Sequence, residues 1–160
     1  MRENSIPPDD PASVPLAAQA LAEATAVAMF ARDAASQALG IAIVAMRPGY
    51  AKVTMTVRAD MLNGHRTCHG AFIFAVADSA FAFSCNSHNR NSVAAGCHID
   101  YLAPAFENDV LEAEAVEQSL KGRTGVYDVA VRNRSGVLIA LFRGKSHRVE
   151  GEVLDRARSQ

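Results

Sequence analysis

The stretch from His69 to Phe83 constrains the fold of this chain more than any other part of the sequence. After Gly70 its only polar residues are Asp78 and Ser79, so a helix formed here has no broad polar face to turn toward water and is expected to be buried. A carboxylate is out of place in that setting, because burying an unpaired charge costs several kcal/mol. We therefore interpret Asp78 as a functional residue. The alternative is a structural aspartate that hydrogen-bonds a neighbouring backbone group.

Gly70 lies where this predicted helix begins. The first N–H groups of a helix have no acceptor within the helix and carry the positive end of its dipole, so they can hold an anion or a polarised carbonyl oxygen. Gly70 and Asp78 are eight residues apart, which places them about 12 Å apart along the helix, too far to act on one reacting atom. Two antiparallel copies of the helix would bring Gly70 of one subunit beside Asp78 of the other. The stretch therefore predicts a composite site at a twofold dimer interface.

The composition limits the classes of function. With 160 residues, of which 49% are hydrophobic and 21% are charged, the chain suits one soluble globular domain. A net charge of -1 lacks the basic footprint of nucleic-acid-binding proteins. The sequence contains no run of the roughly eighteen apolar residues that a membrane span needs. Three cysteines without a CxxC pair indicate the reduced thiols of a cytoplasmic protein.

Residues 15–150 are predicted to form a single domain between two segments that do not belong to its core. Residues 1–14 contain several prolines and aspartates and are predicted to be disordered, and the charged residues 151–160 are predicted to form a frayed tail. Apolar residues at helical spacing predict an N-terminal helix over residues 15–39. The expected apolar face of that helix consists of Leu16, Ala20, Val27, Phe30 and Ala34.

Six segments are predicted to be strands. Apolar and polar residues alternate strictly from Ala51 to Val57, which is typical of a strand with one buried face. Short connections between the later strands require antiparallel pairing. A sheet that curls around the central helix buries it most easily, so the sequence predicts an α+β fold with a curved antiparallel β-sheet wrapped around one long helix, plus the N-terminal helix. The other expected strands are residues 41–46, 92–102, 110–118, 126–132 and 137–149.

The run from Asn63 to Phe81 resembles the HGG…AD…AF signature of hotdog-fold acyl-CoA thioesterases. Residues 99–105, 122–128 and 140–147 resemble the phenylacetate-degradation members of that family in particular. The resemblance implies the hotdog fold and hydrolysis of (hydroxy)phenylacetyl-CoA-type thioesters to the free acid and coenzyme A. It also implies that no cofactor is needed beyond the coenzyme A of the substrate. The implied assembly is a homodimer with composite active sites, paired into a homotetramer.

The resemblance assigns roles to three residues. Asp78 takes the place of the catalytic carboxylate, which acts as a general base on water or as a nucleophile. Gly70 supplies the backbone N–H that polarises the thioester carbonyl, and Asn63 helps to orient the substrate or the water. The chain departs from the signature at Ala71, where a second glycine is usual. A serine or threonine that holds water is often found after the helix in such enzymes, but residues 94–96 are Ala-Ala-Gly.

Thioester hydrolysis suits such a small set of groups, because a thiolate leaves without a strong general acid. An apolar surround should raise the pKa of Asp78, which improves it as a base. The phosphates of coenzyme A call for basic side chains at the rim of the site, and an aromatic acyl group calls for an apolar slot. The basic candidates could instead be solvated strand ends, and the aromatic ones could be core. The candidate substrate-binding residues are His69, Ala71, Phe72, Phe74, Tyr101, Lys121, Arg123, Arg143 and Lys145.

Other chemistries remain as alternatives. A non-catalytic acyl-CoA-binding protein of the same fold and an enoyl-CoA hydratase are the two competing functions. Cys68 or Cys85 could form a nucleophilic pair with a histidine, although a buried cysteine is ordinarily inert. His65, Cys68 and His69 cluster in the sequence without a recognised ligand spacing, so no metal site is expected.

Overall fold

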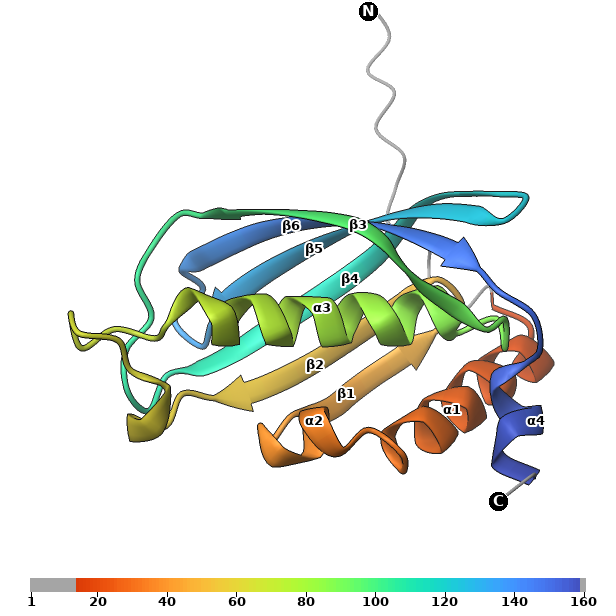
Figure 1. The fold of residues 1–160 in the computed structure, drawn as a ribbon, viewed down its shortest axis with the longest axis horizontal. Helices are drawn as coiled ribbons and strands as arrows, with labels where there is room; N and C mark the ends of the chain where they lie inside the picture. Colours follow the sequence, from red (N-terminus) through yellow and green to blue (C-terminus); the bar gives the residue numbers. More distant parts are fainter. Residues whose placement is uncertain (1–13, 159–160) are drawn as a thin grey trace, which may run out of the picture.

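The computed structural model describes residues 14–158, with side chains as far as Asp155. A six-stranded antiparallel sheet curves around one long helix, α3 (Gly70–Asn86), which lies across its concave face (Figure 1). The strand order β1-β2-β4-β5-β6-β3 makes β1 and β3 the two edge strands. This arrangement confirms the predicted α+β fold. The strands are β1 (Ala42–Arg47), β2 (Tyr50–Thr56), β3 (Ser92–Tyr101), β4 (Val110–Lys121), β5 (Thr124–Asn133) and β6 (Leu138–Arg148).

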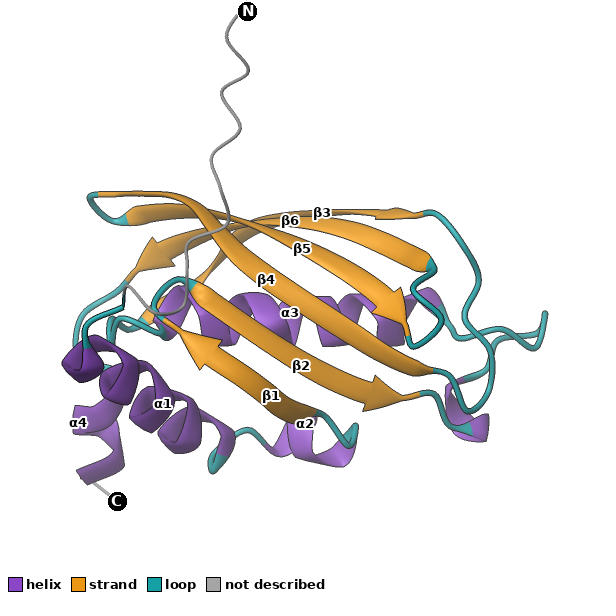
Figure 2. Ribbon diagram, turned by 180° about the vertical axis from the view of Figure 1, so that it is seen from behind, coloured by secondary structure: helices purple, strands orange, loops and turns teal. Residues whose placement is uncertain are grey.

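The sheet has one apolar and one solvent-facing side, as its alternating sequences require. In β2 the side chains of Ala51, Val53 and Met55 are buried, whereas the residues between them point to the outer face. There Lys52 forms an ion pair with Glu112 on β4 at 2.8 Å. Figure 2 shows that, within the described chain, no helix covers this outer face. The core therefore lies between the inner face and α3.

Helix α3 is buried on fewer sides than the sequence predicts. Its sheet-facing side is fully buried, through residues such as Ile73, Val76, Ala77 and Ala80. The opposite side, which we call the open flank of α3, is exposed or half-buried, although Phe74 at its margin also packs against Phe142 of β6. The open flank consists of Ala71, Phe74, Ala75, Asp78 and Ala82.

Helix α3 packs tightly on β6 where the ring of Phe81 lies over Gly144. A Cβ added to Gly144 would lie 2.8 Å from two ring carbons of Phe81. The same ring packs against Tyr127 and Phe142, with centroids 5.6 and 5.8 Å away, and Phe81 is only 1% exposed. The absence of a side chain at Gly144 therefore allows the Phe81 ring of α3 to pack directly against β6.

We expect Gly144→Ala to lower the free energy of unfolding by about 1–3 kcal/mol, because the added methyl group overpacks a filled core. Urea denaturation of the two proteins measures the difference. Gly64→Ala is the matched control, since nothing lies within 4 Å of a Cβ added there. Equal stability of Gly144→Ala and wild type would contradict the close packing described here.

The N-terminal helix differs from its prediction in two ways. The predicted helix over residues 15–39 is broken into α1 (Leu16–Phe30) and α2 (Ala34–Ala38), because Asp33 caps α2 by accepting a hydrogen bond from the Ser36 N–H at 2.9 Å. Its predicted apolar face is also wrong, except at Phe30, whose ring packs against Phe83 with centroids 6.4 Å apart. Leu16 and Val27 are 88% and 70% exposed, whereas the buried residues of α1 are Ala22, Thr25 and Ala26. Small residues at these positions let α1 lie close to its neighbours.

The predicted frayed tail contains a helix, α4 (Val153–Arg158). Val153 is buried, and its carbonyl accepts a hydrogen bond from the Arg32 guanidinium at 3.2 Å. The Leu154 N–H donates to the side-chain oxygen of Asn89 at 3.0 Å. These contacts tie α4 to the core beside α1. The prediction for residues 1–14 lies, apart from Val14, outside the described residues.

None of the helices in the described part of the chain combines the length and apolar character that crossing a bilayer requires.

Candidate active site

Asp78 lies in the middle of the open flank of α3, half-buried. Within residues 14–158 its carboxylate has no hydrogen bond or ion pair, so the structure lacks the backbone contact that a purely structural aspartate would make. Burial raises the pKa of Asp78 above its ordinary value. A half-buried acid with a raised pKa and no partner is suited to take a proton or to attack carbon.

Asp78 is near enough to two cysteines, one on α3 itself and one on the edge strand β3, to affect the pKa of their thiols. After burial, the charge of Asp78 is the next contribution that raises the pKa of two thiols, those of Cys85 and of Cys97 in β3. The pKa of Cys85 rises to about 12, and burial raises that of Cys68 to about 11. Both buried thiols are therefore protonated at neutral pH, which argues against the alternative of a cysteine nucleophile.

The first turn of α3 offers one open backbone donor. His69 accepts two hydrogen bonds, from the Ala71 N–H to its ring Nδ1 at 3.0 Å and from the Phe72 N–H to its carbonyl oxygen at 2.9 Å. The Gly70 N–H has no acceptor among the described residues. Of the N–H groups at this helix start, the one on Gly70 is thus free to polarise a carbonyl oxygen. The backbone of Ala71, a predicted substrate contact, is instead occupied by the cap.

The start of α3 borders a cavity of ≈ 430 Å³. Tyr101 and Gly70 both line it, so the structure brings these two predicted site residues together. Phe72 and Phe74 are half-buried and do not line this cavity. The ring of Phe74 packs against Phe142, with centroids 5.5 Å apart, which makes it a core contact in the protomer. The remaining lining residues are Thr67, Cys68, Ile73, Leu102, Ala103 and Pro104.

Asn63 organises the loop that leads into α3. Its side-chain oxygen accepts hydrogen bonds from the N–H groups of His65 and Thr67, at 2.9 and 3.3 Å, and its amide nitrogen donates to the Thr67 hydroxyl at 3.0 Å. The loop is also fixed at its end, because the Cys68 N–H donates to the Ala105 carbonyl at 2.8 Å. The structure therefore gives Asn63 a supporting role in the protomer, and it reveals Thr67 as a partner that the sequence analysis did not identify.

The four basic candidates lie away from the start of α3. Arg143 forms a bidentate pair with Asp128 on the outer face of the sheet, at 2.6 and 2.7 Å. Arg123 lies immediately before β5 and donates to the Arg148 carbonyl at 3.1 Å. Lys121 and Lys145 are exposed. Within one protomer the structure brings none of these side chains into the cavity beside Gly70.

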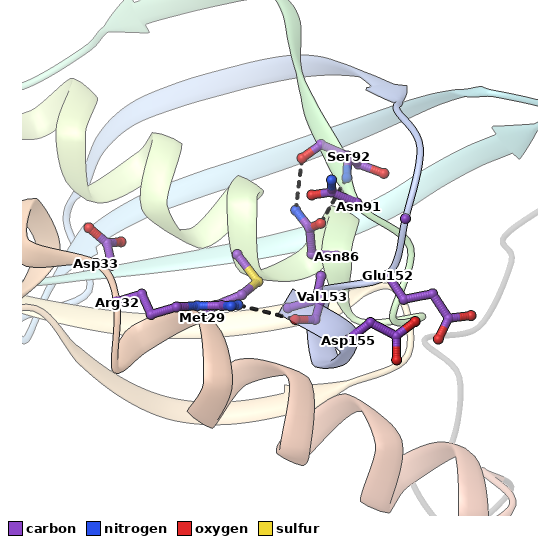
Figure 3. Close-up of a pocket in the computed structure, with 10 residues that line it drawn as sticks. Met29, Arg32, Asp33, Asn86, Asn91, Ser92, Glu152, Val153 and Asp155 are labelled. Atoms are coloured by element: carbon purple, nitrogen blue, oxygen red, sulfur yellow. Dashed lines mark hydrogen bonds between the residues drawn. The ribbon is translucent and has the colours of Figure 1, made fainter. Parts of the chain in front are cut away.

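A larger cavity, of ≈ 740 Å³, lies at the other end of α3, between α1, α4 and the start of β3 (Figure 3). Its polar groups are already engaged. The Asn86 amide donates to the Ser92 carbonyl at 3.1 Å and accepts from the Ser92 N–H at 2.9 Å, and Arg32 donates to Val153. These bonds hold β3 and α4 to the core, so we assign this cavity a structural origin. In the described part of the chain, no group of three or more His, Cys, Asp or Glu side chains is arranged to hold a metal ion.

Comparison with known proteins identifies the family. Residues 65–140 match the thioesterase superfamily. The chain is 49% identical over 130 residues to the acyl-coenzyme A thioesterase PaaI of Escherichia coli (strain K12), an alignment that covers 81% of this chain and 93% of that protein. The structure of the E. coli PaaI protein from the phenylacetic acid degradation operon superimposes with a TM-score of 0.83 at 48% identity, over 84% of this chain and 97% of that chain.

A second PaaI structure gives the same result. The N33D mutant of the phenylacetic acid degradation protein PaaI from Thermus thermophilus superimposes with a TM-score of 0.69 at 43% identity, over 71% of this chain and 97% of that chain. The curved sheet around α3 is thus the hotdog fold, and the resemblance drawn from the sequence motifs is confirmed. The chain belongs to the thioesterase superfamily, and within it to the acyl-CoA thioesterases of the PaaI type.

Proposed function

We propose that this enzyme hydrolyses aromatic acyl-CoA thioesters of the phenylacetyl-CoA type, with or without a ring hydroxyl, to the free acid and coenzyme A. Its relationship to E. coli PaaI supports the substrate class. The observation that carries the mechanism is Asp78, an unpartnered, half-buried carboxylate on the open flank of α3. The free thiols of the chain suit a reaction in the reducing cytoplasm.

The open flank of α3 and the edge strand β3 together favour a homodimer. Most residues of β3 are exposed, including Val93 at 49% and Tyr101 at 51%, and its outer edge has no strand partner within the described chain. An apolar, unpaired edge is a template for pairing with another strand. In the proposed dimer, two β3 strands pair antiparallel and the two open flanks pack against each other. Exposed Val116 and Leu141 on the outer face support the further pairing of dimers into a tetramer.

The positions of residues along α3 and along β3 are consistent with this pairing. Phe74 packs against Phe142, which pairs with Ile99 in the β3–β6 ladder, so the midpoint between Gly70 and Asp78 lies near Ile99. Four helical residues from Phe74 to Asp78 span about 6 Å. Two strand residues from Ile99 toward Ser92 span about 6.6 Å and end at Cys97. The charge of Asp78 contributes to the raised pKa of the Cys97 thiol. A twofold axis near Phe74 and Ile99 therefore aligns both helices and strands, and it brings Gly70 of one subunit beside Asp78 of the other.

In this site the thioester carbonyl oxygen accepts a hydrogen bond from the Gly70 N–H of one subunit, and Asp78 of the other subunit faces the carbonyl carbon. As a base, Asp78 removes a proton from water while the water oxygen bonds to carbon. The negative charge that develops on the thioester oxygen is held by the Gly70 N–H, an interaction worth about 3 kcal/mol in comparable sites. The intermediate then collapses and expels the coenzyme A thiolate. As a nucleophile, Asp78 would instead form a mixed anhydride that water hydrolyses.

The remaining candidate residues surround this reaction centre in the proposal. The cavity beside Gly70, with Tyr101 on its wall, is available to the aromatic acyl group. Asn63 acts by fixing the loop before α3. Lys121, Arg123 and Lys145 are the exposed cations that could pair with the coenzyme A phosphates. Arg143 is already neutralised by Asp128 and is the weakest of the basic candidates.

A free-thiol assay with a panel of acyl-CoA substrates tests the function. We expect thiol release to be faster with phenylacetyl-CoA and its ring-hydroxylated relatives than with acetyl-CoA or a long-chain acyl-CoA. Binding without thiol release would instead indicate a non-catalytic acyl-CoA-binding protein. The panel also includes an enoyl-CoA, and loss of its enoyl absorbance without thiol release would indicate a hydratase.

A single turnover in ¹⁸O-labelled water separates the two roles of Asp78. General-base catalysis places the label only in the released acid. A mixed anhydride, opened by water at the aspartyl carbon, places the label in Asp78, where mass spectrometry of the peptide detects it.

A further inference from the structure

Tyr101, at the end of β3, lies over the first residue of α3. Its hydroxyl donates a hydrogen bond to the Gly70 carbonyl oxygen at 3.1 Å. The ring also covers the α-carbon of Gly70, because a Cβ added there would lie 3.2 Å from Cζ, 3.3 Å from Oη and 3.4 Å from Cε1 of Tyr101. The side chain therefore contacts Gly70 from two directions, through the carbonyl and through the α-carbon.

These contacts favour glycine at position 70. Its backbone does not adopt a positive φ, so the conformation alone does not call for glycine. The Tyr101 ring instead crowds the space for a side chain, since a Cβ there would require the ring to shift by a few tenths of an ångström. Since glycine is the residue with the most backbone freedom, a glycine that presents a catalytic N–H needs an external restraint.

The backbone of Tyr101 is fixed by the sheet, and its half-exposed side chain is anchored to Gly70 through the hydroxyl. It pairs with Ala140 at the end of the β3–β6 ladder, and the next residue, Leu102, donates its N–H to the Ile139 carbonyl at 2.9 Å. On the other side of Gly70, the His69 N–H donates to the Met61 carbonyl at 2.8 Å. The start of α3 is thus fixed between the sheet and the preceding loop.

We infer that Tyr101 is a positioning residue, which acts through Gly70 by fixing the direction of the Gly70 N–H that polarises the thioester carbonyl. This inference rests on the proposed function of that N–H. Tyr101 needs no contact with the reacting atoms for this role, because its hydroxyl is engaged by the Gly70 carbonyl and its ring by the α-carbon. Donors that are fixed before the substrate arrives stabilise charge better than donors that must reorganise.

Tyr101→Phe tests the hydroxyl contact, because it keeps the ring and removes one hydrogen bond. We expect kcat for phenylacetyl-CoA to fall about five- to tenfold, which is the rate effect of losing one neutral hydrogen bond, while KM stays within about twofold. Tyr50→Phe is the matched control. It also removes a tyrosine hydroxyl bond, that to Glu114 at 2.7 Å, but away from the start of α3. Wild-type kcat in Tyr101→Phe, or a change in KM alone, would overturn the inference.

The second readout is the carbonyl stretch of a bound, ¹³C-labelled ketone analogue of phenylacetyl-CoA, with a methylene group in place of sulfur. Infrared spectroscopy should show the stretch of the wild-type complex shifted to lower frequency than in water, and Tyr101→Phe should reverse part of that shift. This comparison does not depend on turnover. Absence of hydrolysis by the wild type would therefore refute the proposed function, whereas an unchanged carbonyl stretch in Tyr101→Phe would refute the positioning role.

A double-mutant cycle tests the ring contact. Gly70→Ala should have a less favourable effect on the Tm in the wild-type background, where the new Cβ lies 3.2 Å from the Tyr101 ring, than in a Tyr101→Ala background, where the ring is absent. Equal costs in the two backgrounds would show that the ring does not confine Gly70 and would overturn this part of the inference.

Discussion

Asp78→Asn is expected to lower kcat for phenylacetyl-CoA hydrolysis by about 10²–10⁴-fold, the range that a general base contributes. Asparagine has nearly the same shape as aspartate, but it can neither accept the proton of the attacking water nor form an anhydride. Steady-state thiol release by the two purified proteins measures the effect. A variant that keeps near-normal rates would remove Asp78 from the mechanism. Asn63→Ala, which loosens a loop but removes no reacting group, should cost less than Asp78→Asn.

Asp78→Asn should also raise the free energy of unfolding. Because burial raises the pKa of Asp78, the folded protein binds its proton more tightly than the unfolded chain does. Stability contributed by this group is therefore lost as the pH rises from the ordinary aspartate pKa through the raised one. Asp78→Asn should have the higher Tm at neutral pH, and the difference should shrink in acid, where Asp78 is protonated in both states. Thermal melts across that range measure it.

Asp60→Asn is the matched control for charge removal. The hydrogen bond from Arg58 holds the pKa of Asp60 below its ordinary value, so neutralising this carboxylate should bring no gain in Tm. The activity of Asp60→Asn should stay at the wild-type level. The pH dependence of the wild type follows from the same reasoning. kcat/KM should rise with pH through the raised pKa of Asp78, because only the ionised form acts as a base.

Mixing two inactive variants is expected to restore activity. Gly70→Val keeps the backbone N–H but is expected to displace it, because the branched side chain meets the Tyr101 ring. In a dimer between a Gly70→Val subunit and an Asp78→Asn subunit, one site carries both defects and the other carries neither. Random assortment makes half of the dimers mixed, so the refolded mixture should recover about a quarter of the wild-type activity. Either variant refolded alone should remain inactive, and native mass spectrometry verifies that mixed dimers form. Mixed dimers without activity would show that Gly70 and Asp78 act within one protomer.

The parts of the fold that were predictable from the sequence are those with strong local signals. Alternation over residues 51–57 identified β2, and the apolar run after Gly70 identified α3. The start of α3 could be placed at Gly70, because the apolar run begins directly after this residue. Asp78 stood out because a lone carboxylate conflicts with an otherwise apolar helix.

The parts that could not be predicted depend on contacts between distant segments. The buried face of α1 consists of small residues, among them Ala22 and Ala26. The positions of the larger apolar residues of α1 therefore indicated the wrong side of the helix as the buried one. The docking of α4 depends on Arg32, which lies far away in the sequence. In the candidate site, Arg143 could not be recognised as paired with Asp128, because that contact follows from the register of β5 and β6.

The exposed edge of β3 also has a consequence for the life of the protein in the cell. If the protein assembles as proposed, a folded protomer that has not yet bound a second copy carries an edge strand onto which another extended chain can pair and aggregate. Substitutions that weaken the association would then reduce the yield of usable protein as well as its turnover. In that case the molecules that can hydrolyse substrate are the dimers, in which the aggregation-prone edge of β3 is already buried.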